Sequence, residues 1–139
     1  MENAPFHLAF TVNDLETTKT FYKDLLGCAV GRESSNWVDF NFFGNQISAH
    51  LSEQKHIDYG KSEVDGKLVP IQHFGVVMKW EMWHQLAEKF RNNKIEFILE
   101  PTVRFRGEPG EQATMFLNDP SGNTLEFKTM KNTKDLFSG

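Results

Sequence analysis

Apolar and polar residues alternate in several short stretches of the chain. From Phe6 to Val12 every second residue is apolar, so one face is apolar and the other carries small and polar residues, among them His7. Period-two alternation is typical of a half-buried β-strand. Strands are likewise predicted at 37–42, 46–51, 71–78, 95–99, 112–117 and 124–128, with a weak one near 29–33.

Two stretches have helical periodicity instead. The first begins after Asp14, a residue type favoured at the helix N-cap, and ends at Gly27, a residue type favoured just past a helix. Its predicted buried face consists of Thr18, Phe21, Tyr22, Leu25 and Leu26. The second helix has Trp83, Leu86, Ala87 and Phe90 at the spacing of one helix face and stops near Asn92.

These elements occur twice in the same order of one strand, one helix and three strands. We therefore predict an α+β fold of two paired βαβββ modules in a single domain. The two first strands match around their histidines, because His7 and His73 are each followed two residues later by a small residue, Ala9 or Gly75. Such units do not close a core alone, so they are expected to pack about a pseudo-two-fold axis.

The boundaries of this organisation follow from the pattern. The stretch Ser52–Val69 is polar, contains two glycines and has no periodic apolar pattern, which predicts a linker or mobile flap. The predicted segments are module 1 at about 4–53, the linker at about 54–69, module 2 at about 70–130 and a tail at 131–139, all in one domain of residues 1–139.

Composition narrows the function classes. The 139 residues suffice for one domain, and a net charge of −4 argues against nucleic acid as a partner. No apolar run approaches the roughly 20 residues that span a bilayer, which predicts no membrane partner. Cys28 is the single cysteine, so no internal disulfide forms, and a reducing cytoplasm is expected. We interpret Cys28 as a packed residue in preference to a catalytic thiol.

The stretch Asp119–Lys128 carries the first candidate for chemistry. Asp-Pro-Ser-Gly-Asn predicts a tight turn, and the strand that follows turns Leu125 and Phe127 to one face and Glu126 to the other. For a single glutamate, a solvent-facing position is the ordinary explanation.

Three histidines change that interpretation. His7 and His73 begin their modules, and His50 and Glu126 lie on the polar faces of the last strands. Two imidazoles and one carboxylate suit a divalent metal such as iron, and a fourth donor would also suit Zn, Ni or Mn. The alternative is that each histidine is an ordinary sheet residue hydrogen-bonded to a neighbour.

The chain resembles the vicinal oxygen chelate superfamily, which includes glyoxalase I, fosfomycin resistance proteins, extradiol dioxygenases and bleomycin resistance proteins. The resemblance covers Pro5 to Lys128 and rests on Phe6-His-Leu-Ala-Phe-Thr-Val-Asn-Asp-Leu15, Phe21-Tyr-Lys-Asp-Leu-Leu-Gly27, His73-Phe-Gly-Val-Val77 and Asp119-Pro-Ser-Gly-Asn-Thr-Leu-Glu126. It implies paired modules that form an open U-shaped barrel around a divalent metal (Fe, Mn, Ni or Zn), a small-molecule substrate and a homodimer.

The resemblance also implies roles for individual residues. His7, His73 and Glu126 match the three ligands shared by the dioxygenases and the fosfomycin enzymes. His50 falls where glyoxalase I has a glutamate as fourth ligand, so it is a candidate ligand, a candidate base or a neighbour of the substrate. The implied chemistry is chelation of a substrate through adjacent oxygens while the metal stabilises an oxyanion.

Three functions compete at this point. A dioxygenase-type enzyme is favoured, because three ligands match without alteration. A glyoxalase-type lyase or isomerase requires His50 to complete a four-ligand site and lacks the usual glutamate as proton-transfer group. A metal-free protein that sequesters a drug is disfavoured, because it has no need to keep all four donors.

Two further sets of residues are candidates for substrate binding. Trp37, Asp39 and Asn41 share a strand face on the side predicted for the ligands, although a solvent-facing strand explains them equally well. The predicted loop Pro101–Glu111 is long enough to act as a lid. In it Arg104 would bind an anionic substrate while Phe105 packs inward; the alternative is pairing of the loop arginines with Glu108 and Glu111.

Overall fold

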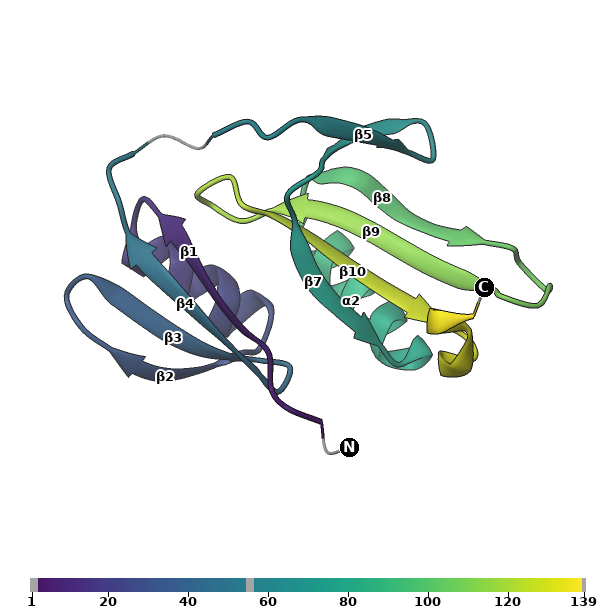
Figure 1. Cartoon of the computed structure of the whole chain (residues 1–139), viewed down its shortest axis with the longest axis horizontal. Coiled ribbons are helices and arrows are strands. Elements are labelled where there is room, and N and C mark those ends of the chain that lie inside the picture. Colours follow the sequence, from purple (N-terminus) through teal and green to yellow (C-terminus); the bar gives the residue numbers. More distant parts are fainter. Residues whose placement is uncertain (1–2, 55–56, 139) are drawn as a thin grey trace. The chain divides into compact units, whose positions relative to one another are not determined.

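The computed structural model describes residues 3–54 and 57–138. The chain forms two compact units (Figure 1). The N-terminal unit comprises residues 1–56 together with the turn Asp119–Asn123, and the C-terminal unit comprises 57–118 and 124–139. Within the described ranges, no helix is long and apolar enough to cross a bilayer.

The N-terminal unit is a four-stranded sheet in the order β1-β4-β3-β2. Strands β1 and β4 are parallel, and the other pairs are antiparallel. Its elements are β1 (His7–Val12), α1 (Leu15–Lys19), the π-helix η1 (Thr20–Leu25), β2 (Ala29–Glu33), β3 (Trp37–Phe42) and β4 (Asn45–Leu51).

The C-terminal unit repeats this topology in the sheet order β7-β10-β9-β8, again with a parallel first pair. Its elements are β5 (Lys61–Val64), β6 (Lys67–Pro70), β7 (Phe74–Met78), α2 (Trp80–Asn92), β8 (Phe97–Arg104), β9 (Gln112–Asn118), β10 (Thr124–Met130) and the 3-10 helix η2 (Thr133–Phe137). The predicted α+β fold with a repeated βαβββ order is confirmed, and neither sheet closes into a barrel.

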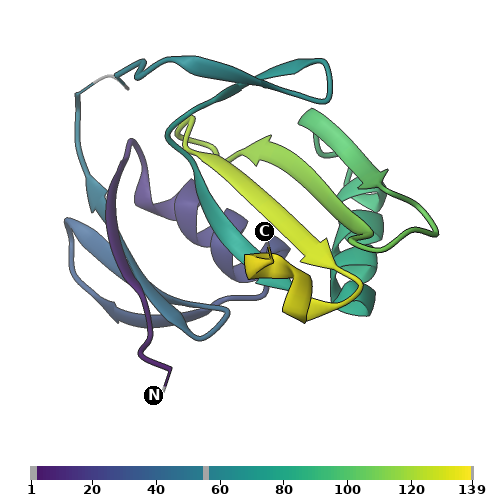
Figure 2. The ribbon, with the colours of Figure 1, turned by 45° about the vertical axis from the view of Figure 1, so that its right-hand side comes forward.

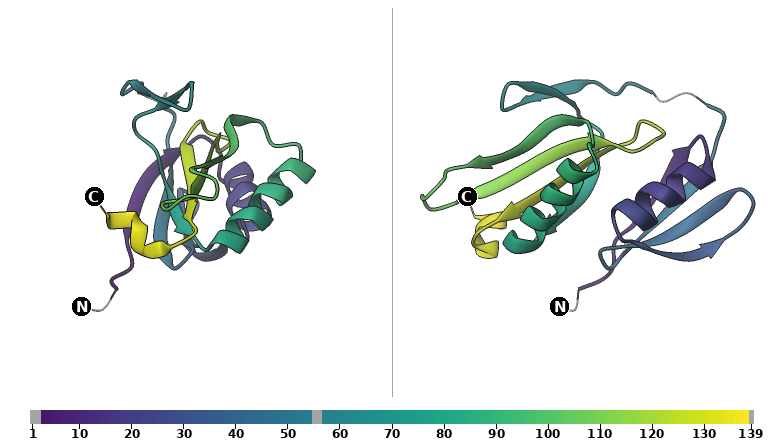
Figure 3. Two further views of the ribbon diagram at one scale, coloured as in Figure 1. Left: turned by 90° about the vertical axis from the view of Figure 1, so that its right-hand side faces the viewer. Right: turned by 180° about the vertical axis from the view of Figure 1, so that it is seen from behind.

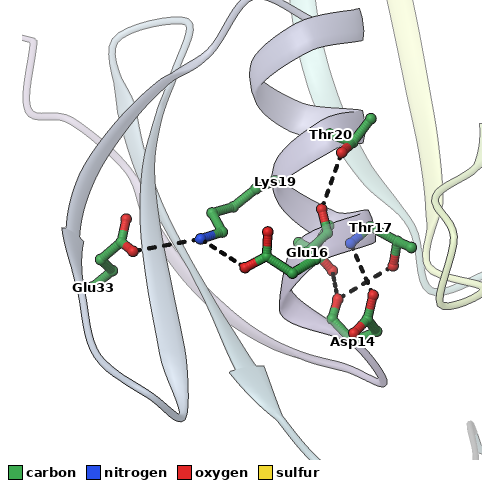
Figure 4. A network of polar contacts seen from close by, with 7 residues as sticks. Asp14, Glu16, Thr17, Lys19, Thr20 and Glu33 are labelled. Carbon is green, nitrogen blue, oxygen red and sulfur yellow. Dashed lines mark hydrogen bonds and ion pairs between the residues drawn. The ribbon is translucent and has the colours of Figure 1, made fainter.

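The first helix begins and ends where the sequence predicts. The Asp14 carboxylate accepts a hydrogen bond of 2.9 Å from the Thr17 amide, which satisfies one of the free amides of the first turn (Figure 4). Lys19 on the helix surface forms ion pairs with Glu16 of the same helix and with Glu33 at the end of β2 (Figure 4). Gly27 has φ of 76° and ends the helix, because its backbone adopts the left-handed conformation without strain.

Each unit buries one helix face against one sheet face (Figure 3). In the C-terminal unit, Trp83 of α2 donates a 2.7 Å hydrogen bond from Nε1 to the carbonyl of Phe127, and Phe90 packs on the same strand residue. The helix faces predicted from periodicity are confirmed except at Leu25, which is half-buried. The buried members are Thr18, Phe21, Tyr22, Leu26, Trp83, Leu86, Ala87 and Phe90. Phe6 and Leu51 differ from the prediction, because each is exposed at a strand end.

The predicted linker contains a β-hairpin, β5–β6, drawn in teal in Figure 2. Its turn is Asp65-Gly66, whose φ angles of 47° and 82° are those of the tight turn that Asp-Gly favours. Val69 of the hairpin packs with Leu99 and Phe116 in a small buried cluster. An Asp-Gly pair between short polar strands was therefore the signal that the composition-based interpretation missed.

Strand β8 is longer than predicted and continues through Pro101 to Arg104. A proline fits there, because β8 is the edge strand of its sheet and its pairing with β9 is irregular between Leu99 and Thr102. The predicted loop Pro101–Glu111 is thereby shortened to 105–111.

Candidate functional site

The strand register defines which positions of the two units are equivalent. Leu8 lies opposite Ile47 in the N-terminal unit, and Phe74 lies opposite Leu125 in the C-terminal unit. Since His7 precedes Leu8 and His73 precedes Phe74, the two histidines are equivalent, as predicted. The residue after Ile47 is Ser48, however, and the residue after Leu125 is Glu126. His50 lies two residues beyond Ser48, so it is not at the position equivalent to Glu126, although both lie on the polar faces of the last strands.

Glu126 occupies the β10 face opposite to the helix-covered face. Its neighbours Leu125 and Phe127 are fully buried against the core, and the alternation of the strand turns Glu126 the other way. The Thr114 hydroxyl donates a 2.6 Å hydrogen bond to Oε2, and the Lys128 ammonium lies 4.0 Å from the same oxygen. The carboxylate is thus held in one orientation with Oε1 left for another partner.

That partner is His73, whose Nε2 lies 3.3 Å from Oε1 of Glu126. The other ring nitrogen, Nδ1, donates a 2.7 Å hydrogen bond to the carbonyl of Pro70 at the end of β6. The Phe116 ring meets the imidazole edge-on at 5.0 Å. Because a carbonyl only accepts, Nδ1 carries the proton and Nε2 of the neutral ring presents a lone pair.

The pair of Nε2 and Oε1 needs a cation between them. Two acceptors at this separation repel unless a proton or a metal ion is shared. The hydrogen bond with Glu126 raises the pKa of His73, although burial opposes it. Burial alone would raise the pKa of Glu126, but the bonds from His73 and Thr114 and the charge of Lys128 lower it.

The same pair fits a divalent ion. Two ligands each about 2.1 Å from one ion, at an angle of roughly 100°, lie about 3.2 Å apart, close to the observed separation. A hydrogen-bonded Nδ1 and a hydrogen-bonded carboxylate are also the supports that ligating histidines and carboxylates have in proteins. Within residues 3–54 and 57–138, no group of three or more His, Cys, Asp or Glu side chains lies close enough to hold a metal by itself.

The N-terminal unit supports its histidine differently. His7 Nδ1 is 2.8 Å from Oε1 of Gln46, directly opposite it on β4, and Gln46 Nε2 is 3.4 Å from Oδ2 of Asp39 on β3. The other oxygen of Asp39 accepts a 2.5 Å hydrogen bond from the buried Ser48 hydroxyl. These four side chains form one connected network on the non-core face of the sheet.

The substrate-binding candidates of β3 share this face. Trp37, Asp39 and Asn41 lie opposite His50, Ser48 and Gln46 respectively. The Arg32 guanidinium lies 5.9 Å over the Trp37 ring, and Asn41 accepts a hydrogen bond from the amide of Gly44 in the turn. All three side chains lie on the face that carries His7, and that of Asn41 also holds the turn between β3 and β4.

His50 lies four residues beyond Gln46 on the exposed end of β4, opposite Thr11. Four strand residues span about 13 Å. Because Gln46 lies opposite His7, His50 is separated from His7 by about that distance along the strands. Its partners in register are Thr11 on β1 and Trp37 on β3.

Phe105 does not adopt the predicted arrangement, and Arg104 pairs with a residue outside its own loop. Arg104 Nε lies 3.5 Å from Oδ1 of Asp65 at the tip of the β5–β6 hairpin, and its guanidinium covers the Phe105 ring at 5.4 Å. Phe105 is 49% exposed with φ of 56°, so it does not pack inward as predicted. This positive φ lies at the start of the turn that follows β8.

The turn after β9 is organised by Asp119. Its carboxylate accepts hydrogen bonds from the amides of Ser121 and Asn123, from the Asn123 side chain and, at 2.8 Å, from the Tyr22 hydroxyl. Burial, with the Asp119 charge, raises the pKa of Tyr22 well above its usual value. This predicted turn is confirmed, and its aspartate is structural.

Cys28 is also structural. The residue is buried, and that burial raises the pKa of its thiol to about 11. A thiol that stays protonated at neutral pH is a poor nucleophile, which agrees with its interpretation as a packed residue.

A family model described as the Glyoxalase/Bleomycin resistance protein/Dioxygenase superfamily matches residues 5–127. The chain belongs to this superfamily. A superfamily protein of known structure from Alicyclobacillus acidocaldarius, described as a glyoxalase/bleomycin resistance protein/dioxygenase, is 32% identical with a TM-score of 0.78 over 97% of each chain. A search of curated protein sequences finds no match.

Two less similar proteins of known structure share the fold. Fosfomycin resistance protein FosX from Listeria monocytogenes has 15% identity and a TM-score of 0.69, covering 97% of this chain and 98% of its own. Lactoylglutathione lyase from Agrobacterium tumefaciens has 13% identity and a TM-score of 0.64, covering 99% and 98%. The resemblance predicted from the motifs is thereby confirmed as to superfamily and fold.

The sequence did not single out Thr114, Gln46 or the carbonyl of Pro70, which hold the candidate ligands. The alternation of apolar and polar residues along 46–51 placed Gln46 on the same face as Ser48 and His50. Nothing else in the sequence pointed to a role for Gln46. Thr114 contacts Glu126 from the neighbouring strand β9, so no local pattern marked it. Pro70 lies only three residues before His73, but it contributes a backbone carbonyl, which a pattern of side chains does not reveal.

Proposed function

We propose that the chain is a metal-dependent enzyme whose small substrate chelates a divalent ion through adjacent oxygens. The observation that carries the proposal is the 3.3 Å pair of His73 Nε2 and Glu126 Oε1, with each partner held by a further hydrogen bond. His7 is the proposed third ligand, by its equivalence to His73 and by the superfamily resemblance.

Two imidazoles and one carboxylate leave positions open for substrate and oxygen, so we favour a dioxygenase-type reaction with Fe²⁺; the same donors accept Mn²⁺, Ni²⁺ or Zn²⁺. A lyase of glyoxalase type needs a fourth ligand. Ser48 stands at the position equivalent to Glu126, and His50 lies at the far end of β4, so neither supports that alternative. A metal-free drug-binding protein would not require the pair.

The bound ion would act as a Lewis acid for the chelated oxygens. The chain would position the groups around it: Thr114 orients the Glu126 carboxylate, and the Lys128 ammonium adds positive charge beside it. We assign Trp37 to the wall that faces the substrate and His50 to a neighbouring position, as a base or a substrate contact. Arg104 is kept as a proposed contact for an anionic substrate.

The test is Glu126→Gln, with Glu100→Gln, an exposed glutamate on β8, as the matched control. Protein purified without added metal is analysed for Fe, Mn, Ni and Zn, and oxygen uptake with catechols is then followed after addition of Fe²⁺. We expect Glu126→Gln to lose at least about 90% of the metal, because the charge that holds the ion is removed. Unchanged metal stoichiometry in this variant would overturn the assignment.

The superfamily resemblance also supports a homodimer, and the single cysteine supports a location in the reducing cytoplasm. Light scattering coupled to gel filtration checks the first of these proposals. A mass of one chain, 16.0 kDa, at micromolar concentration would contradict it.

A further inference from the structure

The amide of Gln46 has a fixed orientation, because its two neighbours differ in what they accept. Asp39 Oδ2, 3.4 Å away, is a carboxylate oxygen and only accepts hydrogen bonds. The NH₂ of Gln46 must therefore face Asp39, and its carbonyl oxygen must face His7. The reverse orientation would bring the amide oxygen against the carboxylate, where two acceptors repel.

This orientation determines the tautomer of His7. The carbonyl oxygen of Gln46 lies 2.8 Å from Nδ1 and only accepts, so Nδ1 carries the proton of the neutral ring. Nε2 is then left with its lone pair, which is the form that binds a metal ion. The C-terminal unit reaches the same tautomer in His73 through the carbonyl of Pro70.

Asp39 is itself anchored. The Ser48 hydroxyl, which is 7% exposed, donates to Oδ1 at 2.5 Å, so the carboxylate keeps Oδ2 directed at Gln46. The carboxylate of Asp39 thus fixes the orientation of the Gln46 amide, and that amide fixes which nitrogen of His7 is protonated. All the donors and acceptors lie on three adjacent strands, β3, β4 and β1.

We propose that Asp39 and Gln46 are positioning residues that set the tautomer of His7 and present its Nε2 to a divalent metal. The metal-binding part of this inference rests on the proposed function, whereas the tautomer does not. Mutation of the residues that hydrogen-bond to ligating histidines typically lowers the metal affinity by about 10–100-fold.

The first test is NMR of the metal-free protein at about pH 8.5, where imidazoles are neutral. The ¹⁵N shifts distinguish a protonated from an unprotonated ring nitrogen. In the parent protein we expect a protonated Nδ1 in His7. Gln46→Leu removes the acceptor and should shift His7 toward the Nε2-protonated form; Gln46→Glu keeps an acceptor and should retain the parent tautomer.

Asp39→Asn tests whether Asp39 sets the orientation of the Gln46 amide. We call the hydrogen-bonded chain Asp39–Gln46–His7 the relay. The amide of the asparagine can keep the oxygen toward Ser48 and turn the NH₂ toward Gln46, which then rotates and donates to Nδ1. We expect the population of the Nδ1-protonated form of His7 to fall, or the Nε2-protonated form to become the major one. The asparagine keeps the shape of the aspartate side chain. Gln85→Leu, the same exchange as Gln46→Leu on the exposed face of α2, is the matched control and should leave the tautomer of His7 unchanged.

The second test is the affinity for Mn²⁺ by titration calorimetry. Gln46→Leu should weaken binding about 10–100-fold and Asp39→Asn about tenfold, with Gln85→Leu unchanged. If the parent protein has the expected tautomers but binds none of Mn²⁺, Fe²⁺ and Zn²⁺, the proposed metal-dependent function is wrong, while the role of Asp39 and Gln46 in setting the tautomer of His7 stands. Unchanged ¹⁵N shifts in folded Gln46→Leu and Asp39→Asn would overturn the relay whatever the metal result.

Discussion

The two units place a histidine at the same position of the same topology and hold it by different means. His73 has a backbone carbonyl behind it and a charged carboxylate in front, at 3.3 Å. His7 has a neutral amide behind it, and its carboxylate, Asp39, lies one residue further back in the network. The repeat therefore preserves the position of the imidazole and a hydrogen bond at its Nδ1. The carboxylate lies beside Nε2 of His73, whereas in the N-terminal unit it lies behind the amide that supports His7.

The equivalent strands differ in a second way. Ala9 and Gly75 follow their histidines by two residues and lie opposite Ser48 and Glu126. A Cβ on Gly75 would overlap the backbone carbonyl of Glu126, whereas the N-terminal unit accommodates the Cβ of Ala9 at the same place. The β7–β10 pair thus leaves no room for a Cβ beside the strand residue that carries the candidate carboxylate.

The largest effect is expected from Gly75→Ala. The added Cβ must displace the backbone of β10 at Glu126, which should reduce the free energy of unfolding by about 3 kcal/mol. Ala9→Gly, the reverse exchange, should cost only about 0.5–1 kcal/mol through chain entropy. Urea unfolding monitored by tryptophan fluorescence compares them. Equal losses of unfolding free energy in the two variants would show that the β7–β10 pair accommodates a Cβ as readily as the β1–β4 pair does.

A smaller effect distinguishes the charged pair of the C-terminal unit. The raised pKa of His73 means that its contribution to stability is present below about pH 6.5 and is lost as pH rises through the folded value. The lowered pKa of Glu126 means that its contribution is present above about pH 4.5 and is lost as pH falls through the folded value. Between these values both groups are charged and the pair is strongest.

The measurement is unfolding of the metal-free protein, with chelator present, at about pH 5.5 and pH 8. Glu126→Gln should lose roughly 1 kcal/mol more stability at the lower pH than at the higher. Gln46→Glu, which places a carboxylate behind His7, provides the comparison in the N-terminal unit. The idea of a C-terminal charged pair fails if the cost of Glu126→Gln is the same at both values.

The smallest effect concerns the β5–β6 hairpin, which precedes β7 in the C-terminal unit only. Arg104 pairs with Asp65 at its tip, and an exposed pair of this kind contributes about 0.2–1 kcal/mol. Arg104→Ala and Asp65→Asn should therefore lower the free energy of unfolding by similar small amounts and leave metal content unchanged.

The same two variants sharpen the proposed role of Arg104 in substrate binding. If the guanidinium also contacts an anionic substrate, Arg104→Ala should weaken binding of an anionic inhibitor about tenfold more than Asp65→Asn does. Equal inhibitor affinities in the two variants would show that Arg104 only fixes the hairpin.

The sequence by itself determined the elements whose periodicity is strong. The apolar faces of both helices, the cap at Asp14, the end at Gly27 and the turn at Asp119 follow from local chemistry, since side-chain spacing and backbone preferences act within a few residues. The repeated βαβββ order and the equivalence of His7 with His73 followed from the same patterns.

The tertiary structure decided what depends on register and on neighbouring strands. That Ser48 and not His50 corresponds to Glu126 is set by the pairing of β4 with β1, which a count along the chain does not fix. Thr114 behind Glu126, Gln46 behind His7 and Asp65 beside Arg104 are contacts between segments, and hydrogen bonds across strands leave no periodic trace in the sequence. Local composition therefore determined which residue types face the candidate site, and strand pairing determined which of them touch.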